Sequence, residues 1–401
     1  MKEMKIQEQE KILTESIQED IPLATLLKSK GINYDDLIYK NNPPIEKECL
    51  KPIELLDDKK EKKGDIPAVS FFSGAGGLNV GFQYAGFQNL ISIELNEIFC
   101  DTLRKNNPGK TVIGPPEYEG DVRKRKELAE ILKGKGIVQP FEGVFHGGPP
   151  CQSFSVAANQ RFNKSGEKFK RKGFDDEEKG MLIFDYIWFI QEFRPYAFLI
   201  ENVEGITDCD TDGKIKKALG ELEKCGYTIT PPQVVNAADY GVPQNRMRWI
   251  AMGTRGKTPI DFPKPDSKKT PCGSVFMRDT AGTENHVTRE HTAESISRYM
   301  LLDYGGRDKK GRVDRLDPQQ PSKTVIAGGT KGGGRSHLHP FIPRTISVRE
   351  CARLQSFPDW YVFTGATARQ FTQVGNAVPP LLAYKLALEI RKAIELDKKK
   401  K

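Results

Sequence analysis

The sequence predicts an α/β protein with a doubly wound, mostly parallel β-sheet and a second, smaller and irregular domain. Between residues 67 and 254, short runs of β-branched and aromatic residues alternate with helical patterns, which is typical of parallel sheets built from βαβ units. From about residue 254 to residue 342, Gly, Pro, Lys and Thr replace this alternation. We therefore expect an accessory helical segment at residues 1–65, a core domain at residues 66–253 plus 344–396, and an irregular domain at residues 254–343.

Length and composition limit the class of protein. A chain of 401 residues is long enough for two domains. No apolar stretch approaches the roughly 18 to 20 residues that cross a bilayer, and the N-terminus lacks the apolar core of a secretory signal, so we expect a cytoplasmic protein. Seven scattered cysteines without a C-x-x-C pair argue against a disulfide framework and a zinc site. The net charge of +8 fits a polyanionic partner, although lysine-rich termini alone would also produce it.

The expected elements follow in chain order. Amphipathic stretches at residues 14–29 and 35–39 and the charged run LDDKKEKKGD indicate helices and then a linker. The run AVSFFSGAGGL predicts a strand, a tight glycine turn and a helix that reaches Tyr84. Further strands are expected at NLISIEL, GVFHGGPP, YAFLIENV and RWIAMGT, with helices such as MLIFDYIWFIQEF between them and on both faces of the sheet. The pattern is helical again from Ser347 and ends in an amphipathic helix from Pro380 to Leu396.

The turn after the first strand resembles a nucleotide-binding loop in composition. Residues 72–77, FSGAGG, lie between a strand and a helix, where backbone approaches a ligand closely. Asn79 fills the third glycine position of a NAD-type fingerprint, so a pyrophosphate ligand is poorly matched. Glu94 ends the next strand, where it could bind a ribose diol, and Asp121 lies where a third loop would meet the same ligand. A plain glycine turn with a surface Glu94 and a solvated Asp121 is the alternative.

Four residues are candidates for catalysis. Cys151 follows the strand GVFH and a double proline that fixes the backbone, so it is expected at the ligand edge of the sheet, whereas the other six cysteines are interpreted as structural. Glu201 ends the strand AFLI at the same edge. Arg246 and Arg248 alternate along a strand and would point to one side. Taken singly, a capping or solvated Glu201 and a salt bridge of either arginine are equally good interpretations.

The motifs, taken together and in this order, are more specific than any one of them. They are FFSGAGGL, Glu94, Gly120-Asp121-Val122, GGPPCQSFS, Gly180-Met181-Leu182, ENV, QNRMR, RECARLQSFPD and QVGNAVPP. This order resembles the DNA (cytosine-5) methyltransferase family of the bacterial restriction-modification type. The resemblance covers residues 67 to about 392, and Lys179, where the family often has arginine, is a small departure.

The resemblance implies an activity and roles for single residues. The chain would transfer a methyl group from S-adenosyl-L-methionine to carbon 5 of cytosine in double-stranded DNA, with S-adenosyl-L-homocysteine as product. Cys151 would add to C6, Glu201 would hold or protonate N3, and Arg248, with Arg246 in support, would bind the O2 edge. A raised pKa of Glu201 would suit this role. The implied cofactor-binding residues are Phe72, Ser73, Gly74, Gly76, Gly77, Glu94, Asp121, Val122, Pro150, Leu182, Asn376 and Val378.

The resemblance also assigns DNA contacts. The target cytosine would be flipped out of the duplex, and the loop after Cys151, with Gln152 and the phosphate-contacting Ser155, would close over the DNA. Residues 254–343 would form the target-recognition domain, in which Arg335 of the stretch GGTKGGGRSHLHP would contact DNA. His337 and His339 are interpreted as polar loop residues, and the chemistry needs no metal.

Double-stranded DNA is the expected partner, with a cognate restriction endonuclease that would act separately, and the chain is expected to be a monomer. An RNA cytosine-5 methyltransferase, a non-catalytic DNA-binding regulator and an NAD-dependent oxidoreductase are alternatives. The long variable domain argues against the first. Intact Cys151, Glu201 and Arg248 argue against the second, and the P-P-C-Q and E-N-V loops against the third.

Overall fold

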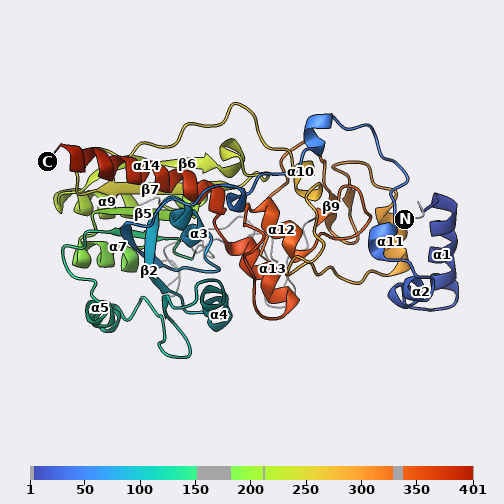
Figure 1. Cartoon of the computed structure of the whole chain (residues 1–401), viewed down its shortest axis with the longest axis horizontal. Coiled ribbons are helices and arrows are strands. Elements are labelled where there is room, and N and C mark those ends of the chain that lie inside the picture. Colours follow the sequence, from blue (N-terminus) through green and yellow to red (C-terminus); the bar gives the residue numbers. More distant parts are fainter. Residues whose placement is uncertain (1–3, 151–181, 211–212, 328–336, 401) are drawn as a thin grey trace. The chain divides into compact units, whose positions relative to one another are not determined.

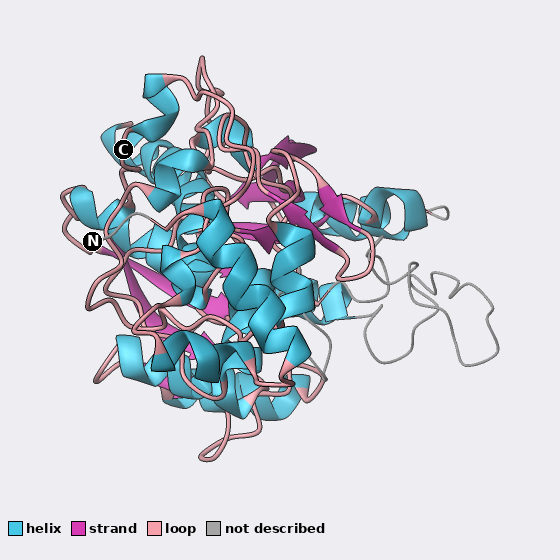
Figure 2. Ribbon diagram, turned by 90° about the vertical axis from the view of Figure 1, so that its right-hand side faces the viewer, coloured by secondary structure: helices cyan, strands magenta, loops and turns pink. Residues whose placement is uncertain are grey.

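The computed structural model describes residues 4–150, 182–210, 213–327 and 337–400 (Figure 1). The chain forms two compact units, which we describe separately, and both contain helices and strands (Figure 2). In the described ranges, no helix is both long enough and apolar enough to span a membrane. The large unit comprises Lys59–Tyr240, Arg246–Ser267 and Ala377–Lys401, and the small unit comprises Met1–Asp58, Gly241–Asn245 and Lys268–Asn376.

The large unit is built on a sheet of seven described strands. The first five strands in the spatial order given below pair in parallel, whereas the sixth is antiparallel to both of its neighbours. The predicted mostly parallel sheet is therefore confirmed. Its strand order is β3 (Thr111–Ile113), β2 (Phe87–Ile93), β1 (Ile66–Phe71), β4 (Val144–Gly147), β5 (Ala197–Val203), β7 (Met247–Thr254) and β6 (Thr228–Asn236).

Helices cover both faces of this sheet. Successive side chains of each strand point to opposite faces, so both faces carry side chains that pack against helices. Val69 and Phe71 share a hydrophobic core with α5 (Arg125–Gly134), α7 (Leu182–Phe193) and α9 (Lys214–Lys224). Ser70 points to the opposite face, where it bonds to Asn79 of α3 (Gly77–Tyr84). The long helix α14 (Pro380–Lys399) packs closely on α3 at Gly81, since a Cβ there would lie 2.5 Å from the Pro380 carbonyl oxygen. The unit also contains α4 (Glu97–Asn106), α8 (Ile206–Cys209) and the 3-10 turn Ala237–Tyr240.

The carboxyl ends of the parallel strands form one edge of this sheet. The strand order reverses beside β1, because β2 and β3 extend the sheet on one side and β4 and β5 on the other. Ligands of open α/β sheets bind at the carboxyl edge near such a reversal. The fold therefore places the predicted glycine turn, Glu94, Asp121 and Glu201 along one edge.

The small unit combines short helices with a three-stranded sheet among its described residues. The expected helix at residues 14–29 is in fact two helices, because Asp20 has a positive φ and Pro22 begins the second. The helix expected at residues 35–39 is wrong, since only the 3-10 turn Tyr34–Asp36 forms. The helices are α1 (Ile6–Gln18), α2 (Leu23–Ser29), α10 (Gly273–Phe276), α11 (Ala293–Tyr299), α12 (Val348–Leu354) and α13 (Thr367–Asn376), with 3-10 turns at Lys47–Leu50 and Leu56–Asp58 and strands β8 (Arg307–Asp308), β9 (Val313–Arg315) and β10 (His337–Leu338).

The compact units divide the chain at different places from the expected domains. Residues 1–58 pack with residues 268–376 and do not form a separate accessory segment. Residues 344–376, which we expected in the core domain, also belong to the small unit. The assignment of residues 254–343 to target recognition stays a prediction.

Candidate functional site

The glycine turn after β1 presents its backbone at the sheet edge. Phe72, Gly74 and Gly76 all have positive φ values, of 50°, 53° and 80°. Such φ values favour glycine, so Phe72 is held in an uncommon conformation by its surroundings. A Cβ on Gly74 would have no described neighbour within 4 Å, whereas Gly76 caps the N-terminus of α3. The turn therefore has space over Gly74 for a ligand.

Glu94 fixes this turn to the end of β2. Its Oε2 accepts a hydrogen bond from the Gly74 amide and its Oε1 from the Asn96 amide, both at 2.8 Å. Burial raises the pKa of Glu94, although these amides oppose the shift. A carboxylate offers about four acceptor positions, so two bonds leave capacity for ribose hydroxyls. Leu95, which the sequence did not single out, is 54% exposed beside Glu94 and offers an apolar contact at the same edge.

Asp121 reaches the same edge through a close backbone approach. Gly120 has φ of 70°, and a Cβ there would collide with the Glu94 carbonyl oxygen. The Asp121 carboxylate accepts bonds from Arg123 Nε at 3.0 Å and Nη2 at 2.7 Å, and these bonds lower its pKa. The loop after β3 is thus packed on Glu94. Arg123, which none of the sequence motifs includes, is a partner of Asp121. Val122 is buried beneath this loop.

The remaining cofactor candidates surround the glycine turn only in part. A Cβ on Gly77 would collide with the Val378 carbonyl oxygen, so this pair is in close contact. Leu182 begins α7 in the core on the face of Phe71, and the Phe72 ring packs edge-on against Tyr186 of the same helix at 6.2 Å. Three further candidates occupy other settings: Ser73 is buried, Pro150 is the last described residue before a gap, and Asn376 ends α13 in the small unit.

A buried polar network lies beneath the glycine turn, and Asn79 is its centre. The Asn79 Oδ1 accepts from Ser70 Oγ and its Nδ2 donates to Ser92 Oγ, both at 2.9 Å, which joins α3 to β1 and β2. Ser73 of the turn donates to Ser70 Oγ at 2.9 Å. Asn89 donates to the Asn79 carbonyl oxygen at 2.8 Å. Asn79, which occupies the third glycine position of a NAD-type fingerprint, therefore connects the turn to the sheet through hydrogen bonds.

If this turn holds the cofactor that the resemblance implies, we expect Asn79→Leu to weaken cofactor binding more than it slows the implied methyl transfer at saturating cofactor. The substitution keeps the branched shape, although Leu is larger, and it removes the acceptor of the Ser70 hydroxyl and the donor to Ser92 Oγ, at a cost of about 1–3 kcal/mol for each unsatisfied buried group. Calorimetric titration with S-adenosylmethionine and thermal melting measure the two effects. Asn79→Asp is the matched control, because its carboxylate still accepts from Ser70 and can accept from Ser92 once that hydroxyl rotates to donate. Unchanged cofactor affinity in Asn79→Leu would remove the positioning role.

Glu201 and Arg248 form a buried ion pair at the neighbouring strands. Arg248 Nε lies 2.7 Å from Glu201 Oε1. Val203 of β5 pairs with Arg248 of β7, so Glu201, two residues earlier, lies diagonally opposite on the same face. Burial raises the pKa of Glu201, while Arg248 and Arg246 act to lower it. Arg246 is buried one residue before β7, where its amide donates to Asn236 Oδ1 at 3.0 Å.

The segment that leads towards Cys151 is shaped around Glu201. A Cβ on Gly148 would lie 2.6 Å from Glu201 Oε2, so only glycine lets this segment pass so close to the carboxylate. Asn202 donates to the Pro149 carbonyl oxygen at 3.4 Å, which joins β5 to the same segment. Neither contact could be predicted from the bare motifs GGPPC and ENV.

Four predicted site residues lie outside the described residues, namely Cys151, Gln152, Ser155 and Arg335. Among the described cysteines, four are buried, and burial raises the pKa of each thiol, that of Cys100 to about 12. These thiols are poor nucleophiles at neutral pH. The four are Cys49, Cys100, Cys272 and Cys351.

The two histidines singled out in the sequence, His337 and His339, make local backbone contacts. His337 Nε2 lies 3.1 Å from the Lys323 carbonyl oxygen. His339 Nδ1 accepts from the Phe341 and Ile342 amides at 3.0 and 3.1 Å. His339 is a loop residue, as predicted, whereas the loop interpretation is wrong for His337, because it is buried and lies in the short strand β10.

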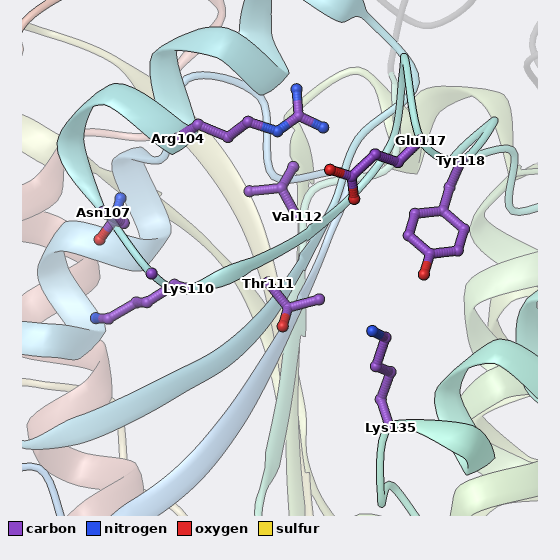
Figure 3. Close-up of a pocket in the computed structure, with 9 residues that line it drawn as sticks. Arg104, Asn107, Lys110, Thr111, Val112, Glu117, Tyr118 and Lys135 are labelled. Carbon is purple, nitrogen blue, oxygen red and sulfur yellow. The ribbon is translucent and has the colours of Figure 1, made fainter.

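A pocket of about 330 Å³ lies elsewhere in the large unit, at the β3 margin (Figure 3). Arg104 and Asn107 lie on one side of it, and Tyr118 and Lys135 on the other. The Lys135 ammonium lies over the Tyr118 ring at 5.9 Å, and Arg104 donates to the Pro115 carbonyl oxygen at 2.8 Å. The pocket contains none of the predicted site residues, and its cations already have partners within the chain.

Comparisons with known proteins identify the family of the chain. The model of the C-5 cytosine-specific DNA methylase family matches residues 66–392. The chain is 32% identical over 346 residues to the Type II methyltransferase M1.HphI of Haemophilus parahaemolyticus, covering 81% of this chain and 86% of the relative. It is 31% identical over 347 residues to the Type II methyltransferase M.NgoFVII of Neisseria gonorrhoeae, covering 80% and 85%.

Solved structures show the same fold. A prophage-encoded protein of E. coli, described as a DNA modification methyltransferase, superposes with a TM-score of 0.66 at 23% identity and covers 82% of this chain and 100% of that one. The Entamoeba histolytica methyltransferase EhMeth superposes with a TM-score of 0.55 at 15% identity, covering 83% and 99%.

Proposed function

Because the chain belongs to the C-5 cytosine-specific DNA methylase family, we propose roles for its residues in the methylation of cytosine carbon 5 in DNA. The enzyme is a DNA cytosine-5 methyltransferase. The observation that carries the residue assignments is the buried Glu201–Arg248 pair, 2.7 Å apart, on the edge that also holds the glycine turn and Glu94. One carboxyl edge thus offers both a cofactor loop and an acid paired with a cation.

The proposed cofactor is S-adenosyl-L-methionine, and the residues present fit it. Gly74 leaves open space over its backbone, and Glu94 keeps acceptor capacity for a ribose diol. Leu95 offers an apolar surface for the adenine, and Asp121 an acceptor for its amino group. When bound, the cofactor supplies an electrophilic methyl group and leaves as S-adenosyl-L-homocysteine.

Glu94→Ala is expected to raise the dissociation constant for S-adenosylmethionine by about 10-fold to 100-fold, because it removes charge-assisted ribose bonds worth about 1.5–3 kcal/mol. It also frees the Gly74 amide, which loosens the turn. Isothermal titration calorimetry measures the constant. Glu97→Ala, on exposed α4 surface nearby, serves as the control, and equal affinities for both variants would refute the ribose assignment.

We assign the chemical step to three side chains and a fourth that supports them. The Cys151 thiolate adds to C6 of cytosine, which pushes electron density into the ring. Glu201, whose raised pKa favours the protonated form, donates to N3 and so neutralises that density. Arg248 holds Glu201 in place through its Nε and binds the O2 edge through its remaining donors, with Arg246 in support. C5 then carries the nucleophilic density that accepts the methyl group. A base or water takes the C5 proton, Cys151 leaves as the thiolate, and the N3 proton returns to Glu201.

The substrate we propose is a specific double-stranded DNA word from which the cytosine is flipped out. The Type II relatives support a protective methylase of a restriction-modification system. We further propose that the enzyme is monomeric and cytoplasmic and that a cognate endonuclease acts separately. Gln152, Ser155 and Arg335 are the proposed DNA contacts. Mapping 5-methylcytosine in DNA from cells that express the chain tests this proposal. We expect one methylated word, and methylation confined to RNA would favour the RNA methyltransferase alternative.

A further inference from the structure

We propose that residues 1–58 are part of the DNA-recognition unit and set the shape of its readout surface. This inference rests on the proposed role of residues 254–343 in reading the DNA word. Residues 1–58 lie before the region that the family model matches, which begins at residue 66. Their packing within the small unit therefore calls for an explanation that is particular to this chain.

The first observation is a shared hydrophobic core. Helices α1 and α2 bury their apolar sides against α11, β9 and β10 in one cluster. Residues from both parts of the chain are almost fully buried, so neither part would have a complete core alone. The N-terminal part contributes Ile12, Leu13, Leu23, Leu26, Leu27 and Leu37, and the later part contributes Ala293, Ile296, Tyr299, Met300, Val313 and Leu338.

The second observation is that Arg315, at the end of β9, is held by the N-terminal segment. Its guanidinium lies 3.5 Å from the centre of the Tyr39 ring and 4.1 Å from that of Tyr304. It also donates to the carbonyl oxygens of Asn41, at 2.7 Å, and Pro340, at 3.0 Å. Arg315 is fully buried, so these contacts replace its hydration shell.

The third observation is an ion cluster at the base of the same segment, in which Arg344 and Glu350 are buried and Asp35 is exposed. Arg344 bonds to both Glu350 oxygens at 2.9 Å and to Asp35 Oδ1 at 2.5 Å. In addition, Tyr39 donates to the His339 carbonyl oxygen at 2.8 Å. Residues 35–39 therefore fix the backbone of residues 339–344, at the C-terminal end of the segment proposed to read DNA.

Charge argues that residues 1–58 position this surface and do not bind phosphate themselves. They carry eight lysines against 13 aspartates and glutamates, whereas the whole chain has a net charge of +8. An acidic segment is repelled by the DNA backbone. Tyr39 is thus a positioning residue for specificity, which acts through Arg315.

The experiment uses single substitutions in the full chain. Tyr39→Leu removes the aromatic face under Arg315, Arg315→Met removes the charge, and Tyr39→Phe, the matched control, keeps the face. The ratio of methylation rates at the mapped word and at words with one base changed is measured where circular dichroism shows the variant folded. We expect this ratio to fall about tenfold or more in Tyr39→Leu and Arg315→Met, and to be retained in Tyr39→Phe. Affinity for S-adenosylmethionine should be unchanged in all three.

Unchanged discrimination in folded Tyr39→Leu and Arg315→Met would overturn the inference. If either variant fails to fold, Asp35→Asn takes its place, because Arg344 keeps its bonds to Glu350 in that variant. Retained discrimination in Asp35→Asn would then count against the inference in the same way. Exchange of residues 254–343 with those of a relative separates this proposal from the proposed function. An exchange that leaves the methylated word unchanged refutes the recognition role itself.

Discussion

Cys151→Ser should lower methyl transfer by about a thousandfold or more, equivalent to about 4 kcal/mol of transition-state stabilisation, while cofactor binding persists. The serine hydroxyl ionises far less readily than a thiol and is a harder, weaker nucleophile towards C6 of cytosine. The proposed cofactor residues Glu94 and Asp121 lie in the segments that follow β2 and β3, so the affinity for S-adenosylmethionine should stay the same. Transfer of tritiated methyl groups to DNA, with calorimetry in parallel, measures both quantities.

The same residue should be trapped by a modified substrate. DNA with 5-fluorocytosine at the target lacks a removable C5 proton, so the Cys151 adduct cannot be released and should survive denaturing electrophoresis. The Cys151→Ser variant should give no such adduct, and Cys225→Ser, at a partly buried described thiol, should give the wild-type amount. A trapped complex with Cys151→Ser would assign the nucleophile to another residue.

Glu201→Gln should slow the chemical step by about 100-fold to 10,000-fold, the usual contribution of a positioned general acid. The amide keeps the size and a hydrogen bond to N3, but it cannot transfer a proton. Burial raises the pKa of Glu201, so the protonated form persists to higher pH than in an exposed glutamate. The turnover number of the native enzyme should therefore fall as the pH rises through this pKa, and single-turnover rates across the pH range measure the effect.

The control for Glu201 separates chemistry from packing. Arg248→Lys keeps a cation beside the carboxylate but not the Nε contact at 2.7 Å. The fall of the single-turnover rate at high pH, which is the alkaline limb of the profile, should therefore shift in pH but persist. Glu201→Gln should flatten that limb. A Glu201→Gln enzyme that retains the native turnover number and the native pH profile would leave Glu201 with a structural role only.

Local patterns in the sequence were sufficient for the sheet and for most of the edge. The strands that end at Phe71, Ile93, Gly147 and Val203 are short apolar runs, and their burial on two faces makes such runs readable without tertiary information. Because parallel strands share one carboxyl edge, the glycine turn, Glu94 and Glu201 could be placed together from order alone. The chain's resemblance to its family, carried by nine motifs, supplied the activity.

Contacts between residues far apart in the chain could not be read in the same way. Asn79 looked like a defect in a fingerprint, and its role depends on hydroxyls of β1 and β2 that only folding brings within 2.9 Å. Gly148 is required by the Glu201 carboxylate, 53 residues later in the chain. Residues 1–58 looked like an accessory segment, because their amphipathic helices reveal an apolar side but not its partner. That partner, including Arg315 against the Tyr39 ring at 3.5 Å, lies more than 200 residues away, and burial of the shared core selects it.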